Sequence, residues 1–279
     1  MFNKSYQVLI LLALLLTACS QQYSAERDFY RASKYSADIF KDPKGIPPYK
    51  FEKALANFQA IMTKYPRTQQ AIESYFIAGD IYMLENRYRD AAALFQTVKK
   101  AYPDQVGLQA RATIAIAGCL EKENDWPGAY RNYREAVEKY PGEPATLQVP
   151  VYILDYYRQS GEKSKEEQVY RQAVRDYKNV INKYSETKSA YSARNLLTEV
   201  YMRGGDWANV LATLSEQVKK YPQSPDAPTW LMTMAATYEM KLNNKAKARE
   251  YYQMVKDKYS TSPWAKEADK RLASLTAAK

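Results

Sequence analysis

The residue types that most often carry chemistry are scarce in this chain of 279 residues. It has no histidine, the commonest general base and metal ligand, and only two cysteines, Cys19 and Cys119. No Gly-x-Ser-x-Gly, His-Glu-x-x-His or phosphate-binding Gly-Lys-Ser/Thr sequence occurs, and the adjacent carboxylates Glu166 and Glu167 fall in a polar turn. We therefore expect no catalytic residue, no metal and no cofactor, and we predict that the protein is not an enzyme.

Cys19 follows a short apolar stretch near the N-terminus. Val8 to Leu16 is nine residues long, too short to cross a bilayer, which needs about 20 residues, but typical of a signal peptide. It ends in Leu16-Thr17-Ala18-Cys19, which resembles a lipobox, the bacterial sequence that directs lipidation of a cysteine and cleavage just before it. We interpret residues 1–18 as a lipoprotein signal peptide and residues 19–24 as a lipidated tether. The alternative is an ordinary signal peptide that happens to meet a cysteine.

The residue after the cysteine bears on location. In bacteria with two membranes, the lipobox resemblance implies that an aspartate at this place retains the protein at the inner membrane, and Ser20 is not an aspartate. We expect the protein to be anchored in the outer membrane and to face the periplasm. In an organism with one membrane it would lie on the outer face of the cytoplasmic membrane. Several acyl chains make a firm anchor, because each buried methylene contributes about 0.8 kcal/mol.

The second cysteine and the charge balance suggest no further chemistry. Cys119 lies among the apolar residues Ile116 to Leu120, so we predict a small core residue rather than a reactive thiol. Lys and Arg exceed Asp and Glu by ten, but the basic residues are scattered and interleaved with acids. We interpret the charge as an aid to solubility, and we expect no nucleic-acid partner, because secretion would keep the chain away from nucleic acid.

One spacing recurs along the body of the chain: an alanine, an aromatic residue four positions later and a tyrosine seven positions after that. The copies are Ala54-Phe58-Tyr65, Ala91-Phe95-Tyr102, Ala129-Tyr133-Tyr140, Ala173-Tyr177-Tyr184 and Ala248-Tyr252-Tyr259, with Val210-Leu214-Tyr221 as a relaxed sixth. These offsets share one stripe of an α-helix, since eleven residues make close to three turns. A proline or serine follows each tyrosine and ends the helix. Six copies at near-constant spacing predict stacked supersecondary units.

A second helix precedes each of these, and together they carry a resemblance. Tyr75, Ala78, Gly79 and Tyr82, followed by Ala91, Phe95 and Pro103, resemble the tetratricopeptide repeat motif in order. The resemblance implies an all-α fold, a right-handed superhelix (α-solenoid) of about six helical hairpins plus a C-terminal capping helix. We expect this solenoid over residues 25–276, with units near residues 25–66, 68–103, 106–141, 146–185, 187–222 and 225–260 and the cap at 263–275.

The anchor and the repeats together resemble a narrower group. Tetratricopeptide-repeat outer-membrane lipoproteins include BamD-like assembly factors and Tol-Pal coordinator-type periplasmic proteins, although six units exceed the five of the BamD-like pattern. This resemblance implies a membrane-anchored periplasmic scaffold for protein–protein interactions, acting as an assembly or coordination factor in the envelope. Its partners would be envelope proteins or peptides, and the membrane through the lipid on Cys19. The alternative is a cell-wall accessory lipoprotein that binds peptidoglycan or another glycan by stacking tyrosines on sugars.

In the family, four positions of each first helix face a concave groove. The resemblance implies the candidate groove residues Glu73, Phe76, Asp80, Met83, Arg111, Ile114, Glu121, Asn195, Glu199 and Met202. This mixed apolar and acidic set suits peptides or helices. We expect Phe76, Met83 and Met202 to lack a packing partner within the array. We expect Ala91 and Ala129, in contrast, at close contacts between helices.

Overall fold

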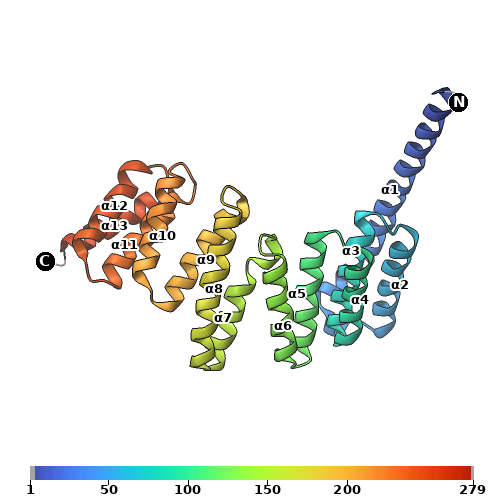
Figure 1. The fold of residues 1–279 in the computed structure, drawn as a ribbon, viewed down its shortest axis with the longest axis horizontal. Coiled ribbons are helices and arrows are strands. Elements are labelled where there is room, and N and C mark those ends of the chain that lie inside the picture. The colour runs from blue at the N-terminus through green and yellow to red at the C-terminus, as the bar shows by residue number, and fades with distance from the viewer. Residues whose placement is uncertain (1–3, 278–279) are drawn as a thin grey trace. The chain divides into compact units, whose positions relative to one another are not determined.

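The structure, a computed structural model, describes the backbone of residues 4–277 and the side chains of residues 21–276 (Figure 1). The regular secondary structure of residues 4–277 is entirely helical, so the all-α prediction is confirmed. The α-helices are α1 (Lys4–Lys41), α2 (Pro48–Lys64), α3 (Gln69–Leu84), α4 (Tyr88–Ala101), α5 (Val106–Lys122), α6 (Trp126–Lys139), α7 (Val149–Ser160), α8 (Lys163–Lys183), α9 (Lys188–Gly204), α10 (Trp207–Lys220), α11 (Ala227–Met240), α12 (Lys245–Lys258) and α13 (Pro263–Ala277). Two short 3₁₀ helices, η1 (Pro43–Gly45) and η2 (Pro144–Thr146), lie in connections.

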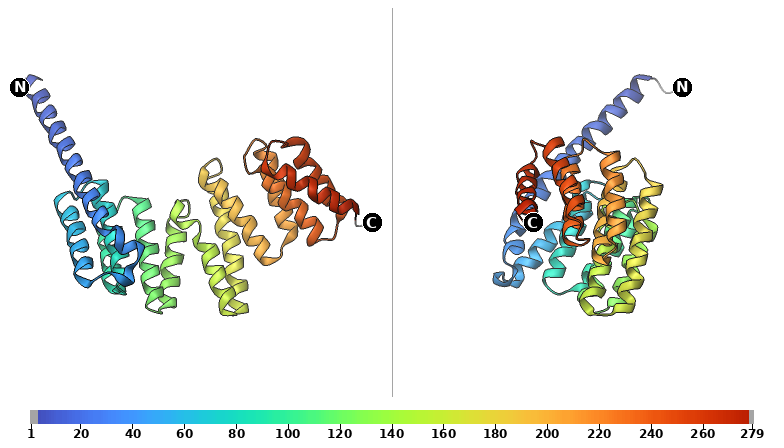
Figure 2. Two further views of the ribbon diagram at one scale, coloured as in Figure 1. Left: turned by 180° about the vertical axis from the view of Figure 1, so that it is seen from behind. Right: turned by 90° about the vertical axis from the view of Figure 1, so that its left-hand side faces the viewer.

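The chain forms two compact units, residues 1–140 and 141–279, where the sequence had suggested one continuous array. Unit 1 stacks three hairpins, α1/α2, α3/α4 and α5/α6. Unit 2 stacks α7/α8, α9/α10 and α11/α12, and α13 covers the last hairpin by packing on α12 and α11. The paired helices of each hairpin run side by side in the views of Figure 2. The six predicted hairpins and the capping helix are thus present.

The turn inside five of the six hairpins, all but α1/α2, uses a residue that tolerates left-handed backbone. Such residues, with positive φ, are Asn86, Asn124 and Asn243 and the glycines Gly161 and Gly205. Asparagine and glycine reach this conformation with little strain, which other side chains do not. The second helix then begins, in three hairpins, at a side-chain cap; Asp125, for example, accepts a hydrogen bond from the amide of Gly128 at 2.9 Å. Local chemistry therefore sets where each hairpin reverses.

The tyrosine that ends a second helix also ties neighbouring repeats together. The hydroxyl of Tyr102 donates to the carbonyl of Pro66 at 2.7 Å, and that of Tyr259 donates to the carbonyl of Pro222 at 2.8 Å. Each acceptor is the proline that follows the terminal tyrosine of the preceding repeat. The spacing of the tyrosines in the sequence is therefore close to the number of residues between one such loop and the next.

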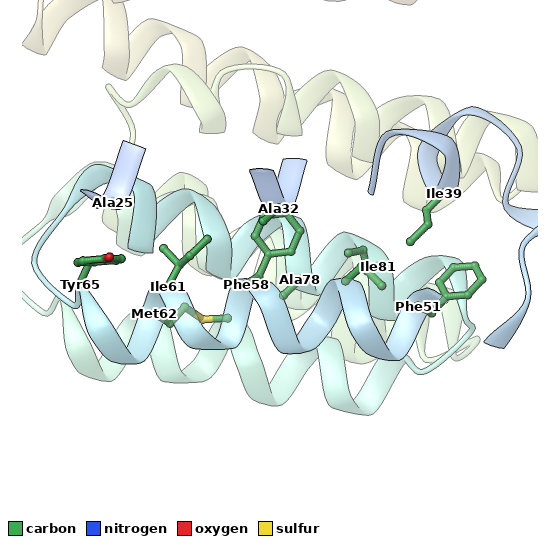
Figure 3. Packing of buried hydrophobic residues seen from close by; sticks show 11 residues of the cluster. Ala25, Ala32, Ile39, Phe51, Phe58, Ile61, Met62, Tyr65, Ala78 and Ile81 are labelled. Carbon is green, nitrogen blue, oxygen red and sulfur yellow. The ribbon is translucent and has the colours of Figure 1, made fainter. Parts of the chain in front are cut away.

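Small residues let the helices of unit 1 approach each other. Ala91 and Ala129 are completely buried, as expected. A Cβ atom on Gly79 of α3 would lie 2.3 Å from the ring of Phe95 on α4, so this glycine is required by close approach. Figure 3 shows the neighbouring cluster in which side chains of α1, α2 and α3, Phe58 among them, meet in one core. Burying a phenylalanine of this kind contributes about 1.5–3 kcal/mol.

Cys119 lies in the core of unit 1, where the sequence predicted it. It is a free cysteine, almost completely buried, beside Ile116 and Val98. Its Sγ lies 3.4 Å from the Sδ of Met83. Burial raises the pKa of this thiol to about 11. The thiol is therefore protonated at neutral pH and suited to packing rather than to nucleophilic chemistry.

The N-terminal predictions fall largely outside the described side chains. The predicted signal peptide, residues 1–18, and the predicted lipidation site Cys19 both lie outside the residues whose side chains the structure describes. Residues 21–24, expected as part of a tether, belong to α1. In the stretch where side chains are described, residues 21–276, there is no helix with the length and apolar character needed to span a membrane.

Candidate functional site

The predicted groove residues lie on three helices. Glu73, Phe76, Asp80 and Met83 are on α3, and Arg111, Ile114 and Glu121 are on α5, all in unit 1, whereas Asn195, Glu199 and Met202 are on α9 in unit 2. Helices α3 and α5 are the first helices of successive hairpins. Direct side-chain contacts join them, so they present one continuous surface.

Arg111 links the two helices of unit 1. Its Nη1 lies 3.3 Å from Oε1 of Glu73, and its guanidinium stands 3.9 Å from the centre of the Phe76 ring. The amide of Gln69 also donates to Glu73 at 2.9 Å, which orients the carboxylate toward Arg111. A cation over an aromatic ring contributes about 0.5–1 kcal/mol at an exposed site, and an exposed ion pair about as much. The three predicted residues therefore form one ordered cluster.

Two apolar members are packed more tightly than the sequence suggested. Phe76 lies 5.7 Å from Phe95, measured between ring centres, and both Phe76 and Met83 pack against the core that contains Phe95 and Cys119. The expectation that Phe76 and Met83 lack a packing partner is wrong. The cause is the close approach at Gly79, which brings α4 near enough for its phenylalanine to reach side chains on the flank of α3.

Asp80 is the member of the cluster left open. Solvent reaches its side chain, and no described residue pairs with it or donates a hydrogen bond to it. Protein surrounds the carboxyl closely enough that desolvation raises its pKa, and the charge of Arg111 only partly offsets this. The carboxylate is therefore exposed and has no partner of its own among the described residues.

Gly118 gives access to that carboxylate. Asp80 lies seven residues after Glu73, and Gly118 lies seven residues after Arg111. Because Glu73 and Arg111 touch, two turns along each helix place Asp80 opposite Gly118. A Cβ atom on Gly118 would meet nothing within 4 Å. We call the surface of Glu73, Phe76, Asp80, Arg111 and Gly118 the α3–α5 face.

The remaining predicted residues of unit 1 border this face. Ile114 is half-buried. Glu121, at the other end of α5, accepts a hydrogen bond from the hydroxyl of Tyr133 at 3.0 Å. Glu121 is thus engaged with the second helix of its own hairpin, and its carboxylate is less available than that of Asp80.

The α9 residues of unit 2 are mostly occupied within the fold. The Asn195 side-chain oxygen accepts from Gln217 at 2.6 Å and from the Trp230 indole at 3.1 Å. Glu199 pairs with Arg203 at 2.5 Å, whereas Met202 is 38% exposed. Asn195 therefore acts as a link between neighbouring hairpins.

Sequence reasoning missed a group of ion pairs between α7 and α9 in unit 2, centred on Arg203. Arg203 holds Asp155 of α7 through two bonds of 2.8 and 3.0 Å in addition to Glu199. These bonds raise the pKa of the Arg203 guanidinium. Arg203 directly follows the predicted residue Met202, and Asp155 lies in the fourth repeat, whose register the motif did not define. We call the surface of Asp155, Glu199, Met202 and Arg203 the α7–α9 face.

The described residues offer no evident metal site. Within residues 21–276, no group of three or more cysteine, aspartate and glutamate side chains is arranged to hold a metal ion. What the α3–α5 face offers instead is recognition by charge, by an aromatic edge and by close approach to backbone.

Several solved structures are similar to this chain at low sequence identity. BtubC from P. vanneervenii is 14% identical, with 87% of this chain and 91% of that chain covered and a TM-score of 0.45. A tetratricopeptide repeat protein from Parabacteroides merdae is 14% identical, with 89% and 91% covered and a TM-score of 0.42. The TPR2AB domain of yeast Sti1, solved as a complex with pHSP90, is 13% identical, with 88% and 99% covered and a TM-score of 0.33.

Comparison of sequences is more specific about the repeats. No curated protein matches the chain. Residues 78–144, which lie almost wholly in unit 1, match the tetratricopeptide repeat family, and so do residues 231–262 of unit 2. The first match covers the α3/α4 and α5/α6 hairpins from Ala78 onward, and the second covers α11/α12. The chain therefore contains tetratricopeptide repeats in both of its compact units.

Proposed function

We propose that the protein is a lipid-anchored scaffold that binds segments of other envelope proteins on the α3–α5 face. The observation that carries this proposal is the open carboxylate of Asp80 near the ordered pair of Glu73 and Arg111, and helical spacing puts the open space at Gly118 across from it. A basic side chain of a partner can reach Asp80 where Gly118 leaves room. An ion pair with this open carboxylate then favours the complex and gives it specificity for a basic segment.

The rigidity of the stack supports binding rather than catalysis. Isolated helices of this length are marginal in water, so stacking is what holds the face in shape. A partner that binds a preformed surface loses less conformational entropy than one that must order it. Phe76 and Arg111 are fixed by their contacts with Phe95 and Glu73, so the surface is ready before a partner arrives.

We propose the anchor from the sequence. Leu16-Thr17-Ala18-Cys19 after a nine-residue apolar run supports lipidation of Cys19, and Ser20 supports the outer membrane, facing the periplasm, as the location. Because α1 includes residues 21–41, a lipid on Cys19 would hold the first hairpin close to the membrane surface. In this setting the protein would act as a BamD-like assembly or coordination factor.

A hollow in unit 2 favours a second candidate, the binding of a cell-wall glycan. It has a volume of about 560 Å³ and lies between α11 and the capping helix α13. Trp264, 40% exposed, borders it together with the hydroxyl of Thr233 and the charged groups of Glu267 and Arg271. An exposed aromatic face beside hydrogen-bonding groups suits a sugar ring.

Site-specific photo-crosslinking in cells tests the scaffold proposal. A crosslinking residue at position 114, which borders the α3–α5 face and leaves Asp80 in place, should give a discrete adduct with an envelope protein, and adding Asp80→Lys should abolish this adduct. The matched control is position 100 on α4, where Lys100 is exposed and unpaired on a second helix. Equal adducts from positions 114 and 100 would refute the α3–α5 face as the binding surface, and recovery of murein fragments in place of protein would favour the glycan candidate.

The anchor has its own test. Cys19→Ala should block processing and remove the lipid, so that metabolic labelling with a fatty acid marks the wild type and not the variant. Equal label on both proteins would show that Cys19 is not the site.

A further inference from the structure

Unit 2 contains a groove apart from the α7–α9 face. It has a volume of about 1020 Å³ and is bordered by α10, the beginning of α11, and α12. Its lining is mainly apolar and includes Val218, Leu231, Met234, Tyr251 and Met254. Ligand pockets typically have volumes of about 300–1,000 Å³, so this groove has room for several side chains of a partner.

The length of one loop accounts for the opening. The loop from α10 to α11 covers residues 221–226 and has six residues. The loops that lead to the first helices α3, α5 and α9 have four residues each, at 65–68, 102–105 and 184–187, and the connection to α7, residues 140–148, contains the 3₁₀ helix η2. The longer loop lets α11 begin farther from α10, which leaves a groove where Val218, Tyr251 and Met254 are only partly buried.

The loop is held firmly, so the groove is preformed. The hydroxyl of Tyr191 lies 2.7 Å from Oγ of Ser224 and donates to Asp226 at 2.6 Å. On the other side, Tyr259 donates to the carbonyl of Pro222 at 2.8 Å. Binding in this groove would therefore not require the loop to be ordered first.

The charges that border the groove are unbalanced. Lys219 of α10 and Lys258 of α12 both line it, are exposed, and have no ion-pair or hydrogen-bond partner among the described residues. The one acidic residue of the lining, Glu250, is paired with Lys247 at 2.7 Å. An occupant with carboxylates would complement the two free lysines, whereas a basic occupant would be repelled.

We propose that this groove binds a segment of a partner protein in which apolar side chains are flanked by carboxylates. The apolar side chains cover Val218, Tyr251 and Met254, which are partly exposed, and the carboxylates pair with Lys219 and Lys258. This surface is independent of the α3–α5 face, which lies in unit 1 and offers an open acid rather than free lysines. The two faces would thus select segments of opposite charge.

The test uses the full chain in detergent and three labelled peptides. The first carries leucine and phenylalanine on one side and glutamate on the other, the second has lysine in place of glutamate, and the third has serine in place of the apolar residues. Fluorescence anisotropy should show binding of the first peptide alone. Combining Lys219→Glu with Lys258→Glu should weaken it about tenfold or more at low salt.

A matched double variant separates this site from general attraction. Lys178→Glu with Lys188→Glu makes the same charge change at exposed, unpaired lysines of the same unit, on α8 and α9. Binding should be nearly unchanged in this control, and a photo-crosslinker at position 215, in the groove lining, should capture the first peptide. Equal weakening in both double variants, equal binding of the lysine peptide, or a dimer of the chain that blocks the groove would each overturn the proposal.

Discussion

In unit 1 the guanidinium of Arg111 pairs with one carboxylate and leaves Asp80 open, whereas in unit 2 Arg203 pairs with two, Asp155 and Glu199. Both arginines lie on first helices of the same type of hairpin. The first face retains an unpaired charge, and the second has its carboxylates satisfied within the fold. Equivalent surfaces of one repeat can therefore serve recognition or internal cohesion, depending on how many acids surround one arginine.

The largest expected difference between the faces is in packing. Replacing Phe76 and Met83 together with serine should destabilise the protein by about 2–5 kcal/mol, since both pack against the core of unit 1. Met202→Ser on the α7–α9 face should change stability by less than about 0.5 kcal/mol, because Met202 is exposed. Chemical denaturation followed by circular dichroism measures both. A stable double variant would show that Phe76 and Met83 are free for binding after all.

Alanine substitutions at two glycines of unit 1 test whether space beside the α3–α5 face is needed for packing or for a partner. Gly79→Ala should destabilise by about 1–3 kcal/mol, because the new methyl group meets the ring of Phe95. Gly118→Ala should stabilise by about 0.5–1 kcal/mol, since the site is open and alanine favours helix. Thermal melts give the two signs. If Gly118→Ala also weakens the crosslink from position 114, the open space at Gly118 serves a partner; an unchanged crosslink would show that it does not.

The next largest difference between the two faces should appear when Arg203 and Arg111 are each replaced by alanine. Arg203→Ala leaves Asp155 and Glu199 unpaired and should cost about 1–2 kcal/mol. Arg111→Ala removes one exposed pair and a ring contact and should cost under about 1 kcal/mol. Melting temperatures at low and high salt test this, because salt screens exposed pairs. Equal losses would contradict the view that the two faces differ in internal pairing.

The smallest effects are on pH dependence, and they have opposite signs. Desolvation raises the pKa of Asp80 in the fold, so its charge opposes folding above that pKa. Asp80→Asn should therefore stabilise at neutral pH, and this gain should shrink as pH falls through the raised pKa and disappear below the ordinary value of 3.8. In unit 2, Lys163 and Arg158 lower the pKa of Glu166, so Glu166→Gln should destabilise at neutral pH, and the loss should vanish as pH falls through the lowered pKa. Thermal melts at a series of acidic pH values measure both effects. If both substitutions changed the melting temperature in the same direction, the opposite pKa shifts of Asp80 and Glu166 would be wrong.

The fold was accessible from the sequence because one helix stripe repeats. The alanine, aromatic and tyrosine positions are fixed by close contacts and by the tie from Tyr102 to Pro66, so their spacing is a direct trace of packing. The turns were equally readable, since Asn86 and Gly205 adopt backbone that few other residues accept. The division into two units left no such trace, because it depends on contacts between hairpins rather than on residues within one.

The site was only partly accessible. The repeat register placed Glu73, Phe76, Asp80 and Arg111 on one surface, but which of them pair and which stay open depends on distances across helices. Asp155 was missed because the first helix of the fourth repeat, α7, lacks the motif residues that define a register, although the second helix carries them. The groove in unit 2 was missed because two extra loop residues look unremarkable until the helices on either side are placed.

Cys119 gives the protein an internal reporter of its own opening. It is buried, its pKa is raised to about 11, and the only other cysteine in the sequence is the proposed lipid site Cys19. A thiol reagent can therefore react with the body of the protein only when the core around Cys119 opens. The rate of labelling in native conditions would measure how often the core of unit 1 opens, and a partner bound on the α3–α5 face should slow the labelling.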